Sequence, residues 1–120
     1  MKSKNFSLFR NLMHSINGLK EVAANEMPMK VELVSFVIMS IVIIFLEMPI
    51  FYKLILFTSL FLPIFAELVN SAIERCVDLV TLEYHELAKH AKDAASAGVL
   101  ISLIITSLIW ITILLKVYYL

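Results

Sequence analysis

Carboxylate and amide side chains recur along one side of a predicted helix in the middle of the chain. Glu67, Asn70, Ser71, Glu74 and Asp78 are spaced so that, at about 100° per helical residue, they return to a single stripe. Carboxylate oxygens bind divalent cations, and a carboxylate can also take a proton from an attacking hydroxyl group. The stripe therefore suits metal-assisted or acid–base chemistry.

The place of this stripe in the chain argues against an ordinary polar surface. An apolar run without ionisable side chains, residues 54–66, leads directly into Glu67 and Asn70. An ionisable group within a membrane segment costs about 2.5–3.5 kcal/mol even on a lenient scale, so such groups usually mark a site or a pathway. For Asp78 and Glu86, nearer a helix end, residence among lipid headgroups is an equally good interpretation.

The composition places the chain in a membrane. Of 120 residues, 61% are hydrophobic and 17% are charged, which is too apolar for an ordinary soluble domain. The formal net charge of zero provides no broad basic surface, so nucleic-acid binding is disfavoured. We expect an all-α membrane protein that forms a single domain over residues 1–120.

The N-terminal arm carries apolar side chains at three- and four-residue steps, namely Phe9, Leu12, Met13, Ile16, Leu19 and Ala23. Basic residues interrupt the arm, so it has neither the apolar core of a signal peptide nor a membrane span. The pattern predicts an amphipathic surface helix over about residues 5–28. A helix packed on the bundle would show the same stripe. Pro28 marks the end of this helix or a restart.

Three transmembrane helices are predicted to follow, at residues 29–47, 49–80 and 94–117. The second extends into the cytoplasm, and a cytoplasmic loop at 81–93 leads to the third. Pro63 falls inside the second span and predicts a kink just before Glu67.

The first predicted span needs additional residues at its ends to cross the membrane. Its apolar run, residues 33–46, is only about 21 Å long as a helix, against a hydrocarbon core of about 30 Å. Met29 and Val31 can extend the helix; a re-entrant segment is the less favoured alternative.

Basic residues set the predicted orientation. One side of the membrane would carry the N-terminal arm with Lys2, Lys4, Arg10, Lys20 and Lys30, together with Arg75, Lys89 and Lys92. The other side would carry only Lys53 and Lys116. The positive-inside rule therefore predicts a cytoplasmic N-terminus and a cytoplasmic region at residues 74–93.

A carboxylate cluster at this position suits phosphoryl transfer from a soluble nucleotide to a lipid. Carboxylates bind Mg²⁺, a lysine offsets the charge of the transferring group, and another carboxylate accepts the hydroxyl proton. The chain has only two glycines, Gly18 and Gly98, so it can form neither a P-loop nor a kinase glycine-rich loop. Any nucleotide enzyme here must be of an unconventional type.

Several motif blocks resemble a known family. The sequence ELVNSAIE at 67–74, Asp78, EYHELAK at 83–89 and AKD at 91–93 are similar to the signature of the small bacterial diacylglycerol kinases, with the related undecaprenol kinases. The resemblance implies a homotrimeric, multi-pass kinase of the bacterial inner membrane that phosphorylates diacylglycerol with MgATP. Its N-terminus would be cytoplasmic.

The resemblance also implies roles for individual residues. Glu67 would be the general base and contact the lipid substrate, with Asn70 as its catalytic neighbour. Glu26 and Glu74 would hold the metal on the nucleotide. The implied ATP contacts are Arg10, Glu26, Glu74, Glu83, Tyr84, His85, Lys92 and Asp93, and Ser96 would lie on the lipid side.

Two alternatives remain open at the level of sequence. Undecaprenol is the competing acceptor within the family, although residues 86–87 and 95–97 favour the diacylglycerol branch. A non-enzymatic proton or cation conduit is the competing class, because lone carboxylates in spans also build relays. Lys92, Asp93 and the Glu-Tyr-His loop have no evident purpose in a conduit.

Overall fold

Five α-helices make up the part of the chain that the computed structural model describes, residues 5–120, and these residues form no strand. The helices are α1 (Leu8–Asn25), α2 (Met27–Phe45), α3 (Ile50–Ser59), α4 (Phe61–Val80) and α5 (Glu86–Tyr118). Three apolar segments are long enough to cross a membrane, Met27–Phe45, Ile50–Val80 and Glu86–Tyr118. The predicted fold class, a surface helix followed by three transmembrane helices, is confirmed. Lys2 and Lys4, which contributed to the predicted orientation, lie outside the described residues.

The first span is longer than its apolar run alone suggested. Helix α2 has 19 residues, which gives a length of about 28 Å, close to the thickness of a hydrocarbon core. It is continuous from Met27 to Phe45, as expected of a spanning helix rather than of a re-entrant segment.

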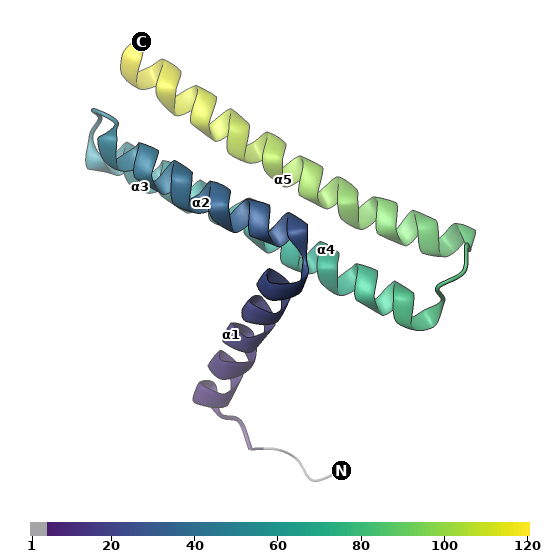
Figure 1. Cartoon of the computed structure of the whole chain (residues 1–120). Coiled ribbons are helices and arrows are strands. Elements are labelled where there is room, and N and C mark those ends of the chain that lie inside the picture. The colour runs from purple at the N-terminus through teal and green to yellow at the C-terminus, as the bar shows by residue number, and fades with distance from the viewer. Residues whose placement is uncertain (1–4) are drawn as a thin grey trace.

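Helix α1 points away from the bundle formed by the other helices (Figure 1). Ser7 caps its first turn by accepting a hydrogen bond from the Arg10 backbone N–H at 3.3 Å. The helix ends at Asn25, and Glu26 adopts an extended backbone with φ −121° and ψ 123°. Pro28 lies in the first turn of α2, where its missing N–H removes no helical hydrogen bond. Pro28 thus accompanies a restart, and the N-terminal helix is shorter than the predicted 5–28.

Helices α4 and α5 form the most extensive pairing in the bundle and lie side by side along a hairpin (Figure 1). Helix α5 begins at Glu86, so the connection between α4 and α5 is limited to residues 81–85, shorter than the predicted loop of 81–93. The Nδ1 atom of His85 accepts a hydrogen bond from the Leu87 N–H at 3.1 Å. Glu86 adds a negative charge to the first turn, which the helix dipole favours.

The second span is interrupted at Leu60, between α3 and α4. This break lies three residues before Pro63. The kink was predicted to lie on the other side of Pro63, directly before Glu67. Proline has no N–H to donate to the carbonyl four residues earlier, and its ring crowds that carbonyl. The freed Ser59 carbonyl instead accepts a hydrogen bond from the Thr106 hydroxyl of α5 at 3.2 Å. A neighbouring helix therefore compensates for the proline.

The best-buried apolar cluster lies away from the α4–α5 loop. Ile43, Leu56, Leu60 and Ile113 join α2, α3 and α5 at the α3–α4 break and beyond it. This packing leaves the loop end of the bundle to the polar residues of α4.

Candidate active site

The polar stripe of α4 faces the protein interior at its membrane end. Glu67 and Asn70 are 6% and 8% exposed, and Ser71 is fully buried. The Glu67 carboxylate lies near enough to Glu74 and Glu26 to interact with their charges. The structure thus brings together three of the carboxylates whose roles the motifs imply.

Glu26 reaches this cluster from the junction of α1 and α2. Its Oε2 atom accepts a hydrogen bond from the Ser71 hydroxyl. Its Oε1 atom accepts from Arg75 Nε at 3.0 Å and from Arg75 Nη2 at 2.8 Å. Arg75 also forms an ion pair with Glu21 of α1, and the guanidinium holds the pKa of the Glu21 carboxyl below its ordinary value. These contacts fix the start of α2 against α4.

Asn70 and Glu74 provide the remaining oxygen donors. Asn70 Nδ2 donates to Glu74 Oε1 at 3.4 Å, and the Asn70 Oδ1 atom is buried without a hydrogen-bond partner. Residues 5–120 contain no group of three or more His, Cys, Asp or Glu side chains arranged to hold a metal ion. Mg²⁺ in nucleotide sites is commonly held by one or two carboxylates together with phosphate oxygens. The carboxylates of Glu26 and Glu74, with the free amide oxygen of Asn70, fit that pattern.

A second polar group lies at the turn between α4 and α5. The side chains of Glu83, Tyr84, His85, Lys92 and Asp93 line a pocket of about 250 Å³. All five belong to the residues for which the motifs imply nucleotide contacts, although the chain separates the loop from the last two by several residues of α5.

Ion pairs order this second group and connect it with the first. Lys92 Nζ donates to Asp78 Oδ1 at 2.6 Å, and Lys89 Nζ donates to Asp93 Oδ2 at 2.6 Å. The Lys92 ammonium also interacts through space with the Glu74 carboxylate. The pocket and the carboxylate cluster therefore form one polar region along α4 and the first turns of α5.

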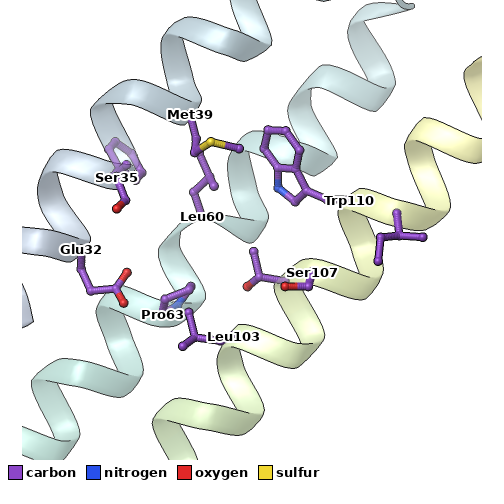
Figure 2. Close-up of a pocket in the computed structure, with 11 residues that line it drawn as sticks. Glu32, Ser35, Met39, Leu60, Pro63, Leu103, Ser107 and Trp110 are labelled. Atoms are coloured by element: carbon purple, nitrogen blue, oxygen red, sulfur yellow. The ribbon is translucent and has the colours of Figure 1, made fainter.

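A largely apolar groove of about 440 Å³ runs between α2, α4 and α5. Figure 2 shows Glu32 at one end of it, opposite Pro63, with Ser107 and Trp110 contributed from α5. The Glu32 and Glu67 carboxylates interact through space, so the groove adjoins the catalytic candidate.

Two of the predicted site residues lie apart from these groups. Arg10 is near the outer end of α1, where its Nη2 atom donates to the Asn5 carbonyl at 2.6 Å. Ser96 is exposed on α5, one helical turn beyond Lys92 and on the same face. A single chain does not bring either residue to the carboxylate cluster.

The sequence did not reveal the pairing of Arg75 with Glu21 and Glu26. Arg75 was counted only as a basic residue near the membrane. One signal for this pairing was available in the sequence. Arg75 directly follows Glu74, on a helix whose other nearby charges are acidic. Its partners depend on the turn at Glu26, which sequence spacing does not give.

Comparison with known proteins supports the resemblance seen in the motifs. The family model described as prokaryotic diacylglycerol kinase matches residues 13–114. A diacylglycerol kinase of Escherichia coli is 35% identical over 101 residues, covering 84% of this chain and 83% of the relative. A diacylglycerol kinase of Helicobacter pylori is 37% identical over 118 residues, covering 98% and 92%. The chain therefore belongs to the prokaryotic diacylglycerol kinase family, whose members are lipid kinases.

Proposed function

We propose that this lipid kinase transfers the γ-phosphoryl group of MgATP to the free hydroxyl group of diacylglycerol, forming phosphatidic acid. The observation that carries the proposal is the order of the polar groups along α4. Glu26 marks the start of the α2 span and contacts Ser71. The level of these two residues therefore corresponds to the membrane boundary.

Glu67 precedes Ser71 by one helical turn and lies about 6 Å deeper along α4. Asp78, paired with Lys92, lies about 10 Å on the other side of that level, toward water. A lipid hydroxyl group lies just below the headgroup region, whereas a nucleotide arrives from water. The depth of Glu67 suits the lipid hydroxyl group, and the pocket beside Lys92 suits the nucleotide.

The chemistry assigns separate tasks to these groups. The acceptor hydroxyl oxygen forms a bond to the γ-phosphorus, the bond from that phosphorus to the β–γ bridging oxygen breaks, and ADP leaves. Glu67 accepts the hydroxyl proton, because a carboxylate that is shielded from water and lies beside other carboxylates is a suitable base. Asn70 orients groups beside it through its amide. Lys92 offsets the charge of the nucleotide phosphates.

A divalent cation fits the same residues. Glu26 and Glu74 would hold Mg²⁺ with the phosphate oxygens, and Asn70 Oδ1 is a further free oxygen donor. When bound, the cation neutralises charge that develops on the transferring phosphoryl group.

The groove lined by Glu32, Pro63 and Trp110 is proposed to accept an acyl chain of the lipid. Its lining is largely apolar, and it adjoins Glu67. A lipid whose chain occupied the groove would present its headgroup at the level of the general base. Exposed Ser96 would contact the headgroup from α5.

A homotrimer in the bacterial inner membrane, with the N-terminus in the cytoplasm, completes the proposal. The single chain leaves the apolar face of α1 exposed, including Phe9 and Leu12, and Arg10 does not reach the nucleotide pocket of its own chain. An assembly in which α1 covers the site of a neighbouring chain would bury the apolar face of α1 and bring Arg10 to a nucleotide pocket. Small domains of this kind commonly require oligomerisation to bury enough surface.

The test is a phosphorylation assay in mixed micelles with radiolabelled ATP. Diacylglycerol and undecaprenol are supplied side by side, and the Glu67→Gln variant sets the background. Faster labelling of diacylglycerol is expected. Preferential labelling of undecaprenol would overturn the proposed acceptor. Binding of ATP with no labelling of either lipid would overturn the proposed reaction.

A further inference from the structure

Arg75 contacts the carboxylate that the proposed function gives to the metal. Its Nε and Nη2 atoms both donate to Glu26 Oε1, at 3.0 and 2.8 Å, while its Nη1 atom pairs with Glu21. Its side chain is 44% exposed and that of Glu26 is 22% exposed. The guanidinium thus bridges two acidic residues on either side of the α1–α2 junction.

Both carboxylate oxygens of Glu26 are occupied in this arrangement. Ser71 donates to one oxygen and Arg75 donates twice to the other. A divalent cation and a guanidinium both seek the lone pairs of a carboxylate, so they compete for Glu26. A cation that takes the Oε1 atom must displace Arg75.

The contact between Arg75 and Glu26 also has an electrostatic role. The charges of Glu26, Glu67 and Glu74 interact, and Glu21 shares Arg75 with Glu26, so mutual repulsion opposes the association of these carboxylates. Arg75 forms its ion pairs with Glu21 and Glu26 themselves, whereas Lys92 pairs with Asp78 and reaches Glu74 only through space. Arg75 therefore supplies the positive charge at the position where the metal would otherwise supply it.

The local structure permits the exchange without unpairing Arg75. Glu26 lies between two helices, and rotation of its side chain leaves its backbone hydrogen bonds with Val22 and Lys30 in place. Glu21 lies on α1 and already pairs with a different guanidinium nitrogen. When Glu26 is released, Arg75 keeps Glu21 as its partner.

We propose that Arg75 is a positioning residue that holds Glu26 as an internal counter-ion in the metal-free enzyme and shifts to Glu21 when the metal binds. The inference rests on the proposed role of Glu26 as a metal ligand. It adds a competition between Arg75 and the cation for the Glu26 carboxylate. Glu21 favours release of Arg75 from Glu26, because it offers the guanidinium a second partner.

The test measures binding of Mn²⁺ alone to the nucleotide-free full-length protein by electron paramagnetic resonance. Arg75→Ala frees Glu26, so Mn²⁺ should bind more tightly by roughly two- to fivefold, the scale of exposed ion pairs. Arg75→Lys keeps the charge but loses the paired donors, and its affinity should fall between those of wild type and Arg75→Ala. Lys20→Ala, which removes an exposed cation next to Glu21, is the charge-matched control and should change the affinity little.

Glu21→Gln should change the Mn²⁺ affinity in the opposite direction. Removing the second partner leaves Arg75 on Glu26, so Mn²⁺ should bind more weakly. In an Arg75→Ala background the same change should have little further effect, because the competitor is already gone. Unchanged or weaker Mn²⁺ binding in Arg75→Ala would overturn the inference. If that variant does not fold, a loss of affinity in Arg75→Lys, or a gain in Glu21→Gln, would do the same.

Failure of the proposed function gives a different result. Absence of lipid phosphorylation by wild type would contradict the reaction and leave the Mn²⁺ measurements intact. If Glu26→Gln does not change Mn²⁺ binding, Glu26 is no metal ligand, and the proposed competition is overturned.

Discussion

The indole Nε1 atom of Trp110 donates a hydrogen bond to the Ser59 hydroxyl oxygen at 3.1 Å, joining α5 to the residue that precedes the break in the second span. Thr106, one turn earlier on α5, donates to the carbonyl of the same residue. The Thr106 bond satisfies the carbonyl that Pro63 leaves without a helical partner, and the Trp110 bond adds a second link to the same residue. They also fix the path of α4, and through it the position of Glu67.

Removing one of these bonds should destabilise the bundle. Thr106→Val leaves the Ser59 carbonyl unpaired in an apolar setting, and hydrogen bonds between membrane helices contribute about 0.6 kcal/mol on average and up to about 1.7 kcal/mol. Reversible unfolding in mixed micelles measures the loss. Thr112→Val on the exposed face of the same helix is the matched control. Equal stability of the two variants would show that the Ser59 carbonyl does not need Thr106.

Glu67→Gln should abolish phosphoryl transfer while nucleotide binding persists. Glutamine preserves size and a carbonyl oxygen but cannot accept the hydroxyl proton, and general-base catalysis supplies about 10²–10⁴-fold. The lipid phosphorylation rate and the affinity for ATP are measured in parallel. Glu47→Gln, an exposed change at the other end of the bundle, should retain activity. A decrease of less than about tenfold for Glu67→Gln would assign the base to another residue.

The carboxylates proposed to hold the metal should act as a unit. Glu26→Gln and Glu74→Gln should each raise the Mg²⁺ concentration needed for half-maximal activity. The double variant should be little worse than the more damaging single change, because the second ligand has little left to hold. Titration of activity with Mg²⁺ checks this expectation. Fully additive losses would mean that the two residues have separate tasks.

Helical periodicity predicted the polar stripe of α4 but not the start of α5. The stripe from Glu67 to Asp78 follows directly from helical spacing, and its burial at Glu67 and Asn70 agrees with the apolar run before it. The start of α5 was misplaced because polar residues after 81 resemble a loop, whereas the His85 cap and the charge of Glu86 start a helix. Charge density in a sequence does not distinguish a loop from a helix end in water.

The contacts of Glu26 lay beyond sequence reasoning for a different reason. They depend on how the α1–α2 junction approaches α4, across a separation of 45 and 49 residues for Ser71 and Arg75. No local pattern encodes such a meeting. The kink was predicted too close to Glu67, because a proline disturbs the carbonyl four residues before it rather than the residues that follow.

Mixed assembly tests whether the proposed trimer shares its sites between chains. Ser15 is exposed on α1, and Ser15→Trp adds bulk to the helix that would cover a neighbour. Once a bulky variant at this position is shown to be inactive alone, it is co-assembled with Glu67→Gln. Some sites then combine an intact α1 with an intact Glu67, and activity should return.

The control for this experiment places both substitutions in one chain and co-assembles it with Glu67→Gln. No site then has an intact Glu67, and no activity should appear. If the two single variants also remain inactive after mixing, although mixed assemblies form, each site belongs to one chain.

The unequal lengths of the spans predict that bilayer thickness affects the proposed reaction. Helix α2 has 19 residues and α5 has 33, which correspond to about 28 Å and about 50 Å. The longer helix exceeds the hydrocarbon slab by roughly 20 Å, whereas the shorter one only just crosses it. Because Glu26 at the start of α2 is bonded to Ser71, hydrophobic mismatch at α2 alters the depth of Glu67 relative to the lipid glycerol groups. A thicker membrane raises those groups away from the carboxylate unless the lipid around α2 thins.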